Sequence, residues 1–207
     1  MSMIKSYPGF LINVEGIDGS GKTTHVKMTK EWLESLGKIV IILKEPTQGK
    51  YGKLISELAS KKMLSPEKEL ELFTEDRKED VKNNILPALN TGNIVIMDRY
   101  YFSNIAYQAA RGLNFDNIKV LNEEFSPIPD LVIVLDIDPI VGMQRINERK
   151  NTVEHFENVE YLMKVREYFE IISKQPNAVL IPTNKSIDEV QKLIENSIRN
   201  KLPSLFR

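Results

Sequence analysis

The segment Gly16–Thr23, with the sequence GIDGSGKT, restricts the fold of this chain more than any other segment. It follows an apolar run, Phe10 to Glu15, that is typical of a buried strand, and it precedes a helical pattern. A Gly-x-x-x-x-Gly-Lys-Thr sequence between a strand and a helix predicts a phosphate-binding loop, or P-loop. The glycines allow a tight turn in which backbone N–H groups gather at the helix N-terminus and bind anions.

This loop predicts a site for the phosphates of a nucleotide together with Mg²⁺. The Lys22 ammonium is expected to reach the outer phosphates and the Thr23 hydroxyl to bind the cation. The alternative is a glycine-rich turn that fits the pattern by chance. The predicted cofactor-binding residues of the loop are Gly16, Asp18, Gly19, Ser20, Gly21, Lys22, Thr23 and Thr24.

Length and composition exclude several classes of function. The 207 residues contain no repeat or shift in composition, so one domain over residues 1–207 is expected. A net charge of −1 argues against a nucleic-acid partner. No apolar run approaches the length of a membrane span and no signal peptide is evident, so a cytoplasmic enzyme is predicted. The absence of cysteine excludes disulfides and thiolate chemistry.

Short β-branched runs alternate with longer helical patterns, which predicts a three-layer α/β/α fold with a five-stranded parallel sheet. The expected strands are Phe10 to Glu15, Ile39 to Lys44, Ile94 to Asp98, Leu131 to Asp136 and Ala178 to Pro182. The expected helices are Thr23 to Leu36, Gly52 to Ser60, Pro66 to Leu89, Tyr101 to Arg111, Asp116 to Glu124, Pro139 to Arg149, Val159 to Lys174 and Ser186 to Lys201. Gly37 should end the first helix, and Pro87 should bend or end the third.

Polar residues follow four of these strands, where a doubly wound sheet binds ligands. They are Glu15, Glu45, Asp98 and Asp136. Asp98 can hold Mg²⁺, directly or through water, and the neighbouring Arg99 offers a planar fork for a phosphate. The alternative for this pair is a structural ion pair between the two side chains.

Five stretches together resemble the thymidylate kinases, which belong to the nucleoside monophosphate kinase group. They cover nearly the whole chain in the family's order. The segment that begins Asp-Arg-Tyr is the most diagnostic of them. The stretches are residues 14–24, Glu45-Pro46, residues 72–77, residues 98–108 and residues 135–139.

The resemblance implies transfer of the γ-phosphoryl group of ATP to dTMP, giving dTDP and ADP for dTTP synthesis. It also implies a homodimer and Mg²⁺ as cofactor. The catalytic residues that it suggests are Lys22, Arg99, Arg149 and Asp18. Asp18 would reach the deoxyribose 3′-hydroxyl or the Mg²⁺ shell, and Arg99 would hold the acceptor phosphate.

The resemblance also assigns the acceptor site. Phe73 would stack on the thymine ring and Arg77 would donate to a thymine carbonyl, and their spacing of four places them on one helix face. Without the resemblance, Phe73 is better explained as core and Arg77 as a surface ion-pair partner. The predicted substrate-binding residues are Asp18, Glu45, Phe73, Arg77, Arg99, Ser103, Asn104, Tyr107 and Gln108. Among them, Tyr107 would crowd the 2′ carbon and thereby reject ribonucleotides; the alternative is a half-buried helix aromatic.

A basic segment after the fourth strand matches the family's mobile lid, at about residues 145–157. Arg145 would stack on adenine, and Arg149 or Lys150 would bring positive charge to the transferred phosphoryl group. The alternative is a solvated helix end. Some family members carry a catalytic basic residue where this chain has Gly19, so the lid is expected to carry that function here, as in the bacterial type.

Two other activities share the P-loop. A GTPase needs an Asn-Lys-x-Asp segment, and Ile187 stands in the place of its carboxylate in the nearest candidate. A deoxynucleoside kinase would need a carboxylate base near a 5′-hydroxyl, for which Glu45 is available. Comparing thymidine with dTMP as acceptor separates the second alternative from a thymidylate kinase.

Overall fold

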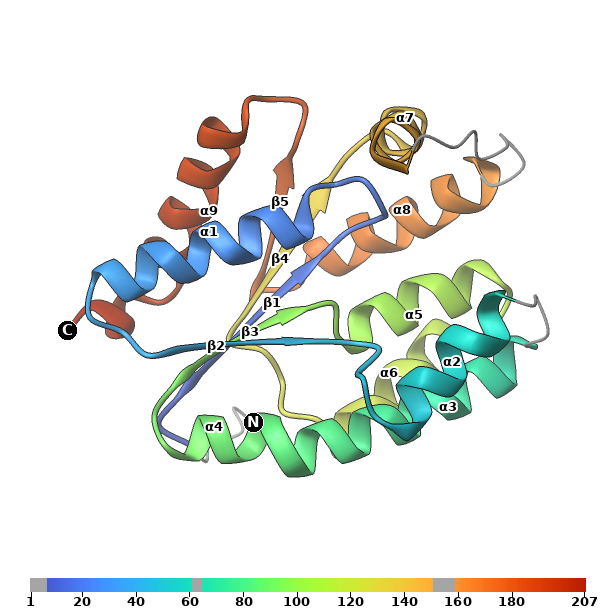
Figure 1. Cartoon of the computed structure of the whole chain (residues 1–207), viewed down its shortest axis with the longest axis horizontal. Coiled ribbons are helices and arrows are strands. Elements are labelled where there is room, and N and C mark those ends of the chain that lie inside the picture. The colour runs from blue at the N-terminus through green and yellow to red at the C-terminus, as the bar shows by residue number, and fades with distance from the viewer. Residues whose placement is uncertain (1–6, 61–64, 151–158) are drawn as a thin grey trace.

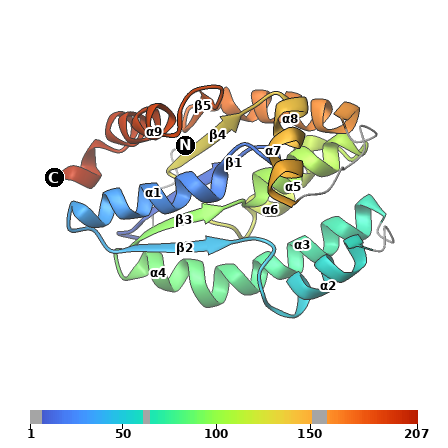
Figure 2. The same cartoon turned by 45° about the horizontal axis from the view of Figure 1, so that its top comes forward.

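Five parallel strands form one sheet in the order β2-β3-β1-β4-β5. The computed structural model of the chain describes residues 7–60, 65–150 and 159–207, with the backbone alone at residues 59, 60, 149 and 150. The arrowheads of the strands point toward the side where α2, α3 and α7 lie (Figures 1 and 2). The strands are β1 (Phe10–Glu15), β2 (Val40–Lys44), β3 (Ile94–Asp98), β4 (Leu131–Asp136) and β5 (Ala178–Pro182).

Helices cover both faces of the sheet (Figure 1). The α-helices are α1 (Lys22–Ser35), α2 (Lys50–Ser60), α3 (Pro66–Asp80), α4 (Leu86–Asn90), α5 (Tyr101–Ala110), α6 (Phe115–Glu123), α7 (Pro139–Lys150), α8 (Val159–Ser173) and α9 (Ile187–Lys201). A π-helical turn, η1 (Val81–Ile85), joins α3 to α4, and a short 3₁₀ helix, η3 (Pro203–Phe206), lies near the C-terminus. No helix in the described ranges is both long and apolar enough to cross a membrane.

Alternate residues of the strands enter two separate cores. On one face, Ile12 and Ile96 pack with α1 and α9 through side chains such as Leu33 and Ile194. On the other face, Leu11 and Val95 pack with α4, α5, α6 and α8. This two-sided burial explains the nearly continuous apolar sequence of the strands and confirms the predicted α/β class with its five-stranded parallel sheet.

The predicted elements agree with the structure to within two residues, except in the third helix. The helix does not end at Pro87: the π turn η1 precedes the proline and the chain stays helical to Asn90. Leu86 N–H donates to Val81 O, five residues back, and this wider turn accommodates a residue that has no N–H to donate. Gly37, with φ of 76°, ends α1 as predicted, because its N–H and that of Lys38 bond the last carbonyls of the helix.

Candidate active site

The P-loop joins β1 to α1 and holds a buried lysine. Lys22 Nζ donates to the carbonyl oxygens of Gly16 at 3.0 Å and Ile17 at 2.9 Å, and it lies 3.8 Å from Asp18 Oδ1. Burial, with a smaller contribution from the nearby Arg99 charge, lowers the pKa of Lys22 to about 7. An anion bound at the loop would therefore stabilise the charged form of Lys22 and raise its pKa.

Close backbone approach explains two of the loop glycines. A Cβ atom on Gly16 would lie 2.4 Å from Leu135 O, and one on Gly19 would lie 2.2 Å from Gly142 O. Both residues also have positive φ, 138° and 83°. A larger residue at position 19 would therefore require this backbone to shift, which supports the prediction that the basic residue is supplied elsewhere.

Thr23 and Asp98 meet at the carboxyl end of the sheet. The Thr23 hydroxyl donates to Asp98 Oδ2 at 2.8 Å, and Lys44 Nζ lies 3.4 Å from the same oxygen. Asp98 Oδ1 is buried and has no hydrogen-bond partner among the described residues. An unpartnered carboxylate oxygen beside a threonine hydroxyl fits a hydrated Mg²⁺ ion. The described residues contain no group of three His, Cys, Asp or Glu side chains that could hold a metal.

Arg99 is placed between this site and the next cavity. It follows β3 with a positive φ of 70°, a strained conformation for a residue with a side chain. Its guanidinium donates to Asp18 Oδ1 at 2.5 Å and to Ser103 Oγ at 3.0 Å, and it lies 5.3 Å from the centre of the Tyr107 ring. The alternative of an Asp98–Arg99 ion pair is wrong, because the two side chains take different partners.

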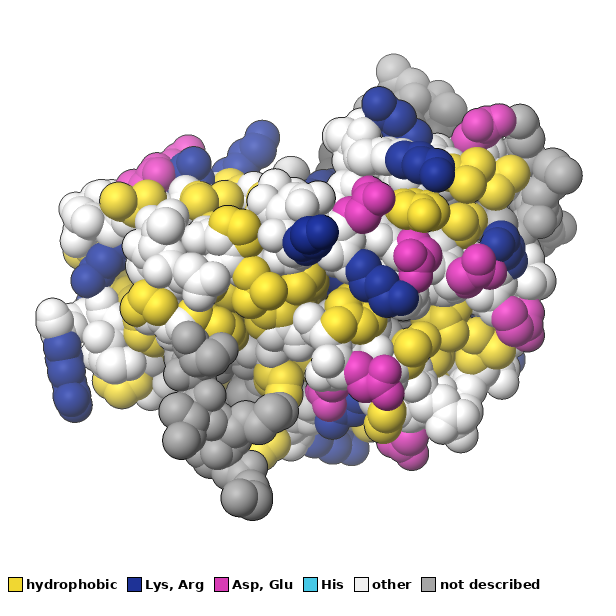
Figure 3. Space-filling view, turned by 90° about the horizontal axis from the view of Figure 1, so that it is seen from below, with side chains coloured by type: hydrophobic (Ala, Val, Ile, Leu, Met, Phe, Trp, Pro, Cys, Tyr) yellow, Lys and Arg dark blue, Asp and Glu magenta, His cyan; other side chains and the backbone are white. Residues whose placement is uncertain are grey.

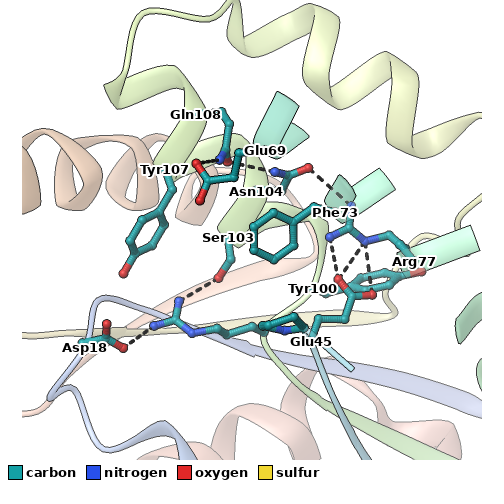
Figure 4. A pocket seen from close by; sticks show the side chains of 12 residues that line it. Asp18, Glu45, Glu69, Phe73, Arg77, Tyr100, Ser103, Asn104, Tyr107 and Gln108 are labelled. Atoms are coloured by element: carbon teal, nitrogen blue, oxygen red, sulfur yellow. Dashed lines mark hydrogen bonds and ion pairs between the residues drawn. The ribbon is translucent and has the colours of Figure 1, made fainter. Parts of the chain in front are cut away.

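A cavity of about 240 Å³ opens beside Arg99 (Figure 4). Phe73 and Arg77 of α3 both line it, as their spacing predicted. Every predicted substrate-binding residue contributes to its wall. The lining residues are Asp18, Glu45, Pro46, Glu69, Phe73, Arg77, Arg99, Tyr100, Ser103, Asn104, Tyr107 and Gln108.

Arg77 is fully buried and is held from three elements. Its Nε and Nη2 donate to the Glu45 carboxylate, at 2.9 Å and 2.5 Å from Oε2. Its Nη1 donates to Asn122 Oδ1 of α6 and, at 3.5 Å, to Asn104 Oδ1 of α5. Burial raises the pKa of Glu45 to about 7, and the charge of Arg77 opposes that shift. The Glu45 carboxylate faces Arg77, so it is poorly placed to act as a general base toward the 5′-hydroxyl of a nucleoside.

Tyr107 points into the same cavity, near Asp18 (Figure 4). Tyr161, at the start of α8, supports it: the Tyr161 hydroxyl donates to Tyr107 O at 3.1 Å, and the two rings meet edge to face at 6.1 Å. Tyr107 is thus both a half-buried helix aromatic and part of the cavity wall, so the two interpretations of this side chain are compatible.

A second cavity, of about 350 Å³, lies on the other side of the P-loop between α1, α7 and α9. Arg145 lines it and donates to Gly19 O at 3.4 Å and to Thr183 O at 3.0 Å. Its other lining residues include Ser20, Thr24, His25, Glu148 and Lys185. The side chains of Arg149 and Lys150, and residues 151–157 of the predicted lid, lie outside what the structure describes.

The structure adds residues that the sequence did not single out for the site. Glu69 lies four residues before Phe73 and eight before Arg77, so the helical spacing of the two predicted residues could have identified it.

Glu15, noted only as a polar strand end, accepts hydrogen bonds from Tyr100 N–H at 2.8 Å and from the Ser103 hydroxyl at 2.5 Å. Asn122 carries no comparable signal in the sequence. By contrast, Asp136 pairs with Arg166 at 2.6 Å and lines neither of these two cavities.

The chain is similar in sequence to known proteins. Residues 14–194 match the family model described as thymidylate kinase. The sequence is 45% identical to a probable thymidylate kinase of Archaeoglobus fulgidus over 93% of this chain and 96% of that protein. It is 39% identical to a probable thymidylate kinase of Pyrococcus horikoshii over 95% and 99% of the two chains. It is also 38% identical to a thymidylate kinase of Akkermansia muciniphila over 100% and 99%.

Proposed function

Because the chain belongs to the thymidylate kinase family, we propose that it transfers the γ-phosphoryl group of ATP to dTMP, with dTDP and ADP as products. Family membership and the names of the relatives support phosphorylation of dTMP. The choice of ATP as donor, and the part of each residue in the reaction, belong to the proposal.

The observation that carries this assignment is that two cavities share residues. Asp18 and Arg99 line the cavity that contains Phe73 and Arg77, and they also line the smaller cavity of about 120 Å³ formed by Lys22, Thr23 and Asp98. A nucleoside monophosphate in the first cavity and a nucleoside triphosphate on the P-loop would therefore bring their phosphates together at these two residues. That is the geometry that direct, in-line transfer requires.

Different side chains would bind the donor phosphates, the acceptor phosphate and Mg²⁺. Lys22, released from the carbonyls of its own loop, would hold the donor phosphates, and Arg99 would hold the phosphate of dTMP as a planar fork. Thr23 and Asp98 would hold Mg²⁺, which neutralises charge on the donor phosphates when it is bound. A phosphate oxygen of dTMP is already a nucleophile, so no carboxylate base and no covalent enzyme intermediate are needed.

The base and sugar would be selected by the remaining wall of the cavity. Phe73 would stack on thymine, and Arg77, fixed by Glu45 and Asn122, would donate to a carbonyl of the base. The Tyr107 ring would occupy the space that a 2′-hydroxyl needs.

An assay of ADP release tests this proposal. With MgATP, the enzyme should turn over dTMP at least about a hundredfold more efficiently than thymidine, because Arg99 has no phosphate to hold in the nucleoside. Thymidine as the better acceptor would favour a deoxynucleoside kinase. No ADP release with any pyrimidine deoxynucleotide would contradict the assignment as a whole.

The proposal includes three further features: a single domain with a lid, a homodimer and a cytoplasmic location. Residues 1–207 would act as one kinase domain, with a lid at about 145–157 that brings Arg149 to the phosphates.

The chain would form a homodimer. Figure 3 shows hydrophobic side chains gathered among charged ones on one face, and α6 exposes Val120 and Leu121. Light scattering should then give twice the chain mass of 23.8 kDa, whereas the single mass would contradict the dimer. A cytoplasmic location stays a prediction.

A further inference from the structure

A chain of hydrogen bonds runs along the wall of the acceptor cavity between two ion pairs (Figure 4). It begins at Arg77, whose Nη1 donates to Asn104 Oδ1 at 3.5 Å. Asn104 Nδ2 donates to Gln108 Oε1 at 2.8 Å, and Gln108 Nε2 donates to Glu69 Oε2 at 2.9 Å. Arg111 then pairs with the same oxygen of Glu69.

The two charged ends determine which way each amide points. A guanidinium can only donate, so Asn104 must turn its oxygen toward Arg77. A carboxylate can only accept, so Gln108 must turn its nitrogen toward Glu69. The central bond from Asn104 to Gln108 is compatible with both requirements, whereas reversal of either amide would oppose two donors or two acceptors.

This polarity determines what the cavity offers to a pyrimidine. Arg77 supplies an N–H group, and beside it Asn104 Oδ1 supplies an acceptor. Thymine and uracil carry the complementary pair, an acceptor at O4 next to a donor at N3. Cytosine carries the reverse pair, an amino donor at position 4 next to an acceptor at N3.

We propose that Glu69 is a positioning residue for base selection: by fixing the orientation of Gln108, which holds Asn104 at 2.8 Å, it reinforces the Asn104 orientation that the 3.5 Å contact with Arg77 also requires, and so favours 4-oxo over 4-amino pyrimidine monophosphates. This inference rests on the proposed function. Glu69 acts here through the amides and not through contact with the reacting phosphates.

The test compares Glu69→Gln with the wild-type enzyme on dTMP and 5-methyl-dCMP, two acceptors that differ only at position 4 and N3. A neutral amide oxygen accepts weaker hydrogen bonds than a carboxylate, and the new NH₂ group competes as a donor, so Gln108 is held less firmly even though Arg111 still faces position 69. We expect the ratio of kcat/KM for dTMP to that for 5-methyl-dCMP to fall about tenfold, mostly through KM, while kcat for dTMP stays within about twofold. The matched control is Glu71→Gln, on the same helix, whose carboxylate pairs with Lys68 outside the cavity; it should leave the ratio unchanged.

The exchange variant Glu69→Gln with Gln108→Glu separates positioning from mere structural support. A carboxylate at position 108 accepts from both Asn104 and the new amide, so the orientation of Asn104 is restored. The ratio should return to within about threefold of wild type. An unchanged ratio in Glu69→Gln, or no recovery in the exchange variant, would overturn the inference.

Calorimetric binding of dTMP and 5-methyl-dCMP gives the same ratio for any variant that is inactive but folded. If a variant does not fold, the wild-type enzyme can still refute the inference: equal affinity for the two nucleotides would overturn it. A wild-type enzyme that does not phosphorylate dTMP would instead contradict the proposed function.

Discussion

The acceptor cavity and the phosphate loop differ in how their polar groups are satisfied. In the acceptor cavity, Arg77 meets Glu45, Asn104 and Asn122, and Glu69 meets Gln108 and Arg111. In the phosphate loop, Ser20 Oγ is buried with no hydrogen-bond partner in the described parts of the chain, and Lys22 donates to carbonyls of its own loop. Beside the loop, Asp98 Oδ1 of β3 is likewise buried without a partner there.

This difference indicates which half of the site is built before a ligand arrives. Apart from the Tyr107 hydroxyl, which has no hydrogen-bond partner among the described residues, the polar side chains named in the acceptor cavity are already paired, so dTMP binding should require little reorganisation. The phosphate loop leaves unsatisfied groups whose pairing needs phosphate and a cation. Removing a loop residue that does not line the acceptor cavity, such as Lys22, should therefore impair catalysis and leave dTMP binding nearly intact.

The largest effect is expected for Lys22→Ala. The variant loses the ammonium that holds the donor phosphates, so kcat should fall about a thousandfold. Calorimetry should show dTMP affinity within about twofold of wild type, because Lys22 does not line the acceptor cavity. The control is Lys27→Ala, an exposed lysine on the same helix. A thousandfold loss of dTMP affinity would show that the two halves are not independent.

Arg149→Ala should have the next largest effect. If the lid supplies the mobile cation, kcat should fall about a hundredfold while dTMP binding changes little. Lys150→Ala is the control that assigns the effect to one of the two neighbours. A near-normal kcat in Arg149→Ala would remove this residue from the mechanism.

Arg99→Lys tests the residue that lines both the acceptor cavity and the smaller cavity at the phosphate loop. A lysine keeps the charge but cannot contact Asp18, Ser103 and a phosphate in one plane, so kcat/KM for dTMP should fall about thirtyfold. The control is Arg166→Lys, because Arg166 pairs with Asp136 through two hydrogen bonds away from these cavities. This variant should leave kcat/KM for dTMP nearly unchanged. Equal rates in Arg99→Lys and wild type would mean that planar geometry is not needed.

The smallest effect is a proton taken up when MgATP binds. In the free protein, burial lowers the pKa of Lys22 to about 7, so at pH 8 this amine is mostly neutral. Phosphates at the loop favour the charged form and raise the pKa, so binding at pH 8 should take up about one proton, and uptake should fall below pH 7. Calorimetry in buffers of different ionisation enthalpy measures it. Lys22→Met should abolish the uptake; persistent uptake in that variant would assign it to another group.

The sequence predicted the local parts of this site well. Gly16, Lys22 and Thr23 lie where their motif placed them, because a P-loop is formed by neighbours along the chain. The spacing of Phe73 and Arg77 correctly placed both in one cavity. The π turn before Pro87 was not predicted, because the response of a helix to a proline depends on how the following segment packs.

What the sequence alone determined is the α/β class, the phosphate loop and the resemblance that names the reaction, all of which depend on residue types at short, regular spacing. Only the tertiary structure decided the partners of the buried charges, as when Asn122 of α6 reaches Arg77 of α3 or Arg99 pairs with Asp18 instead of its neighbour Asp98. The physical reason is that a buried polar group must find a partner, and which partner is within reach depends on how distant segments pack.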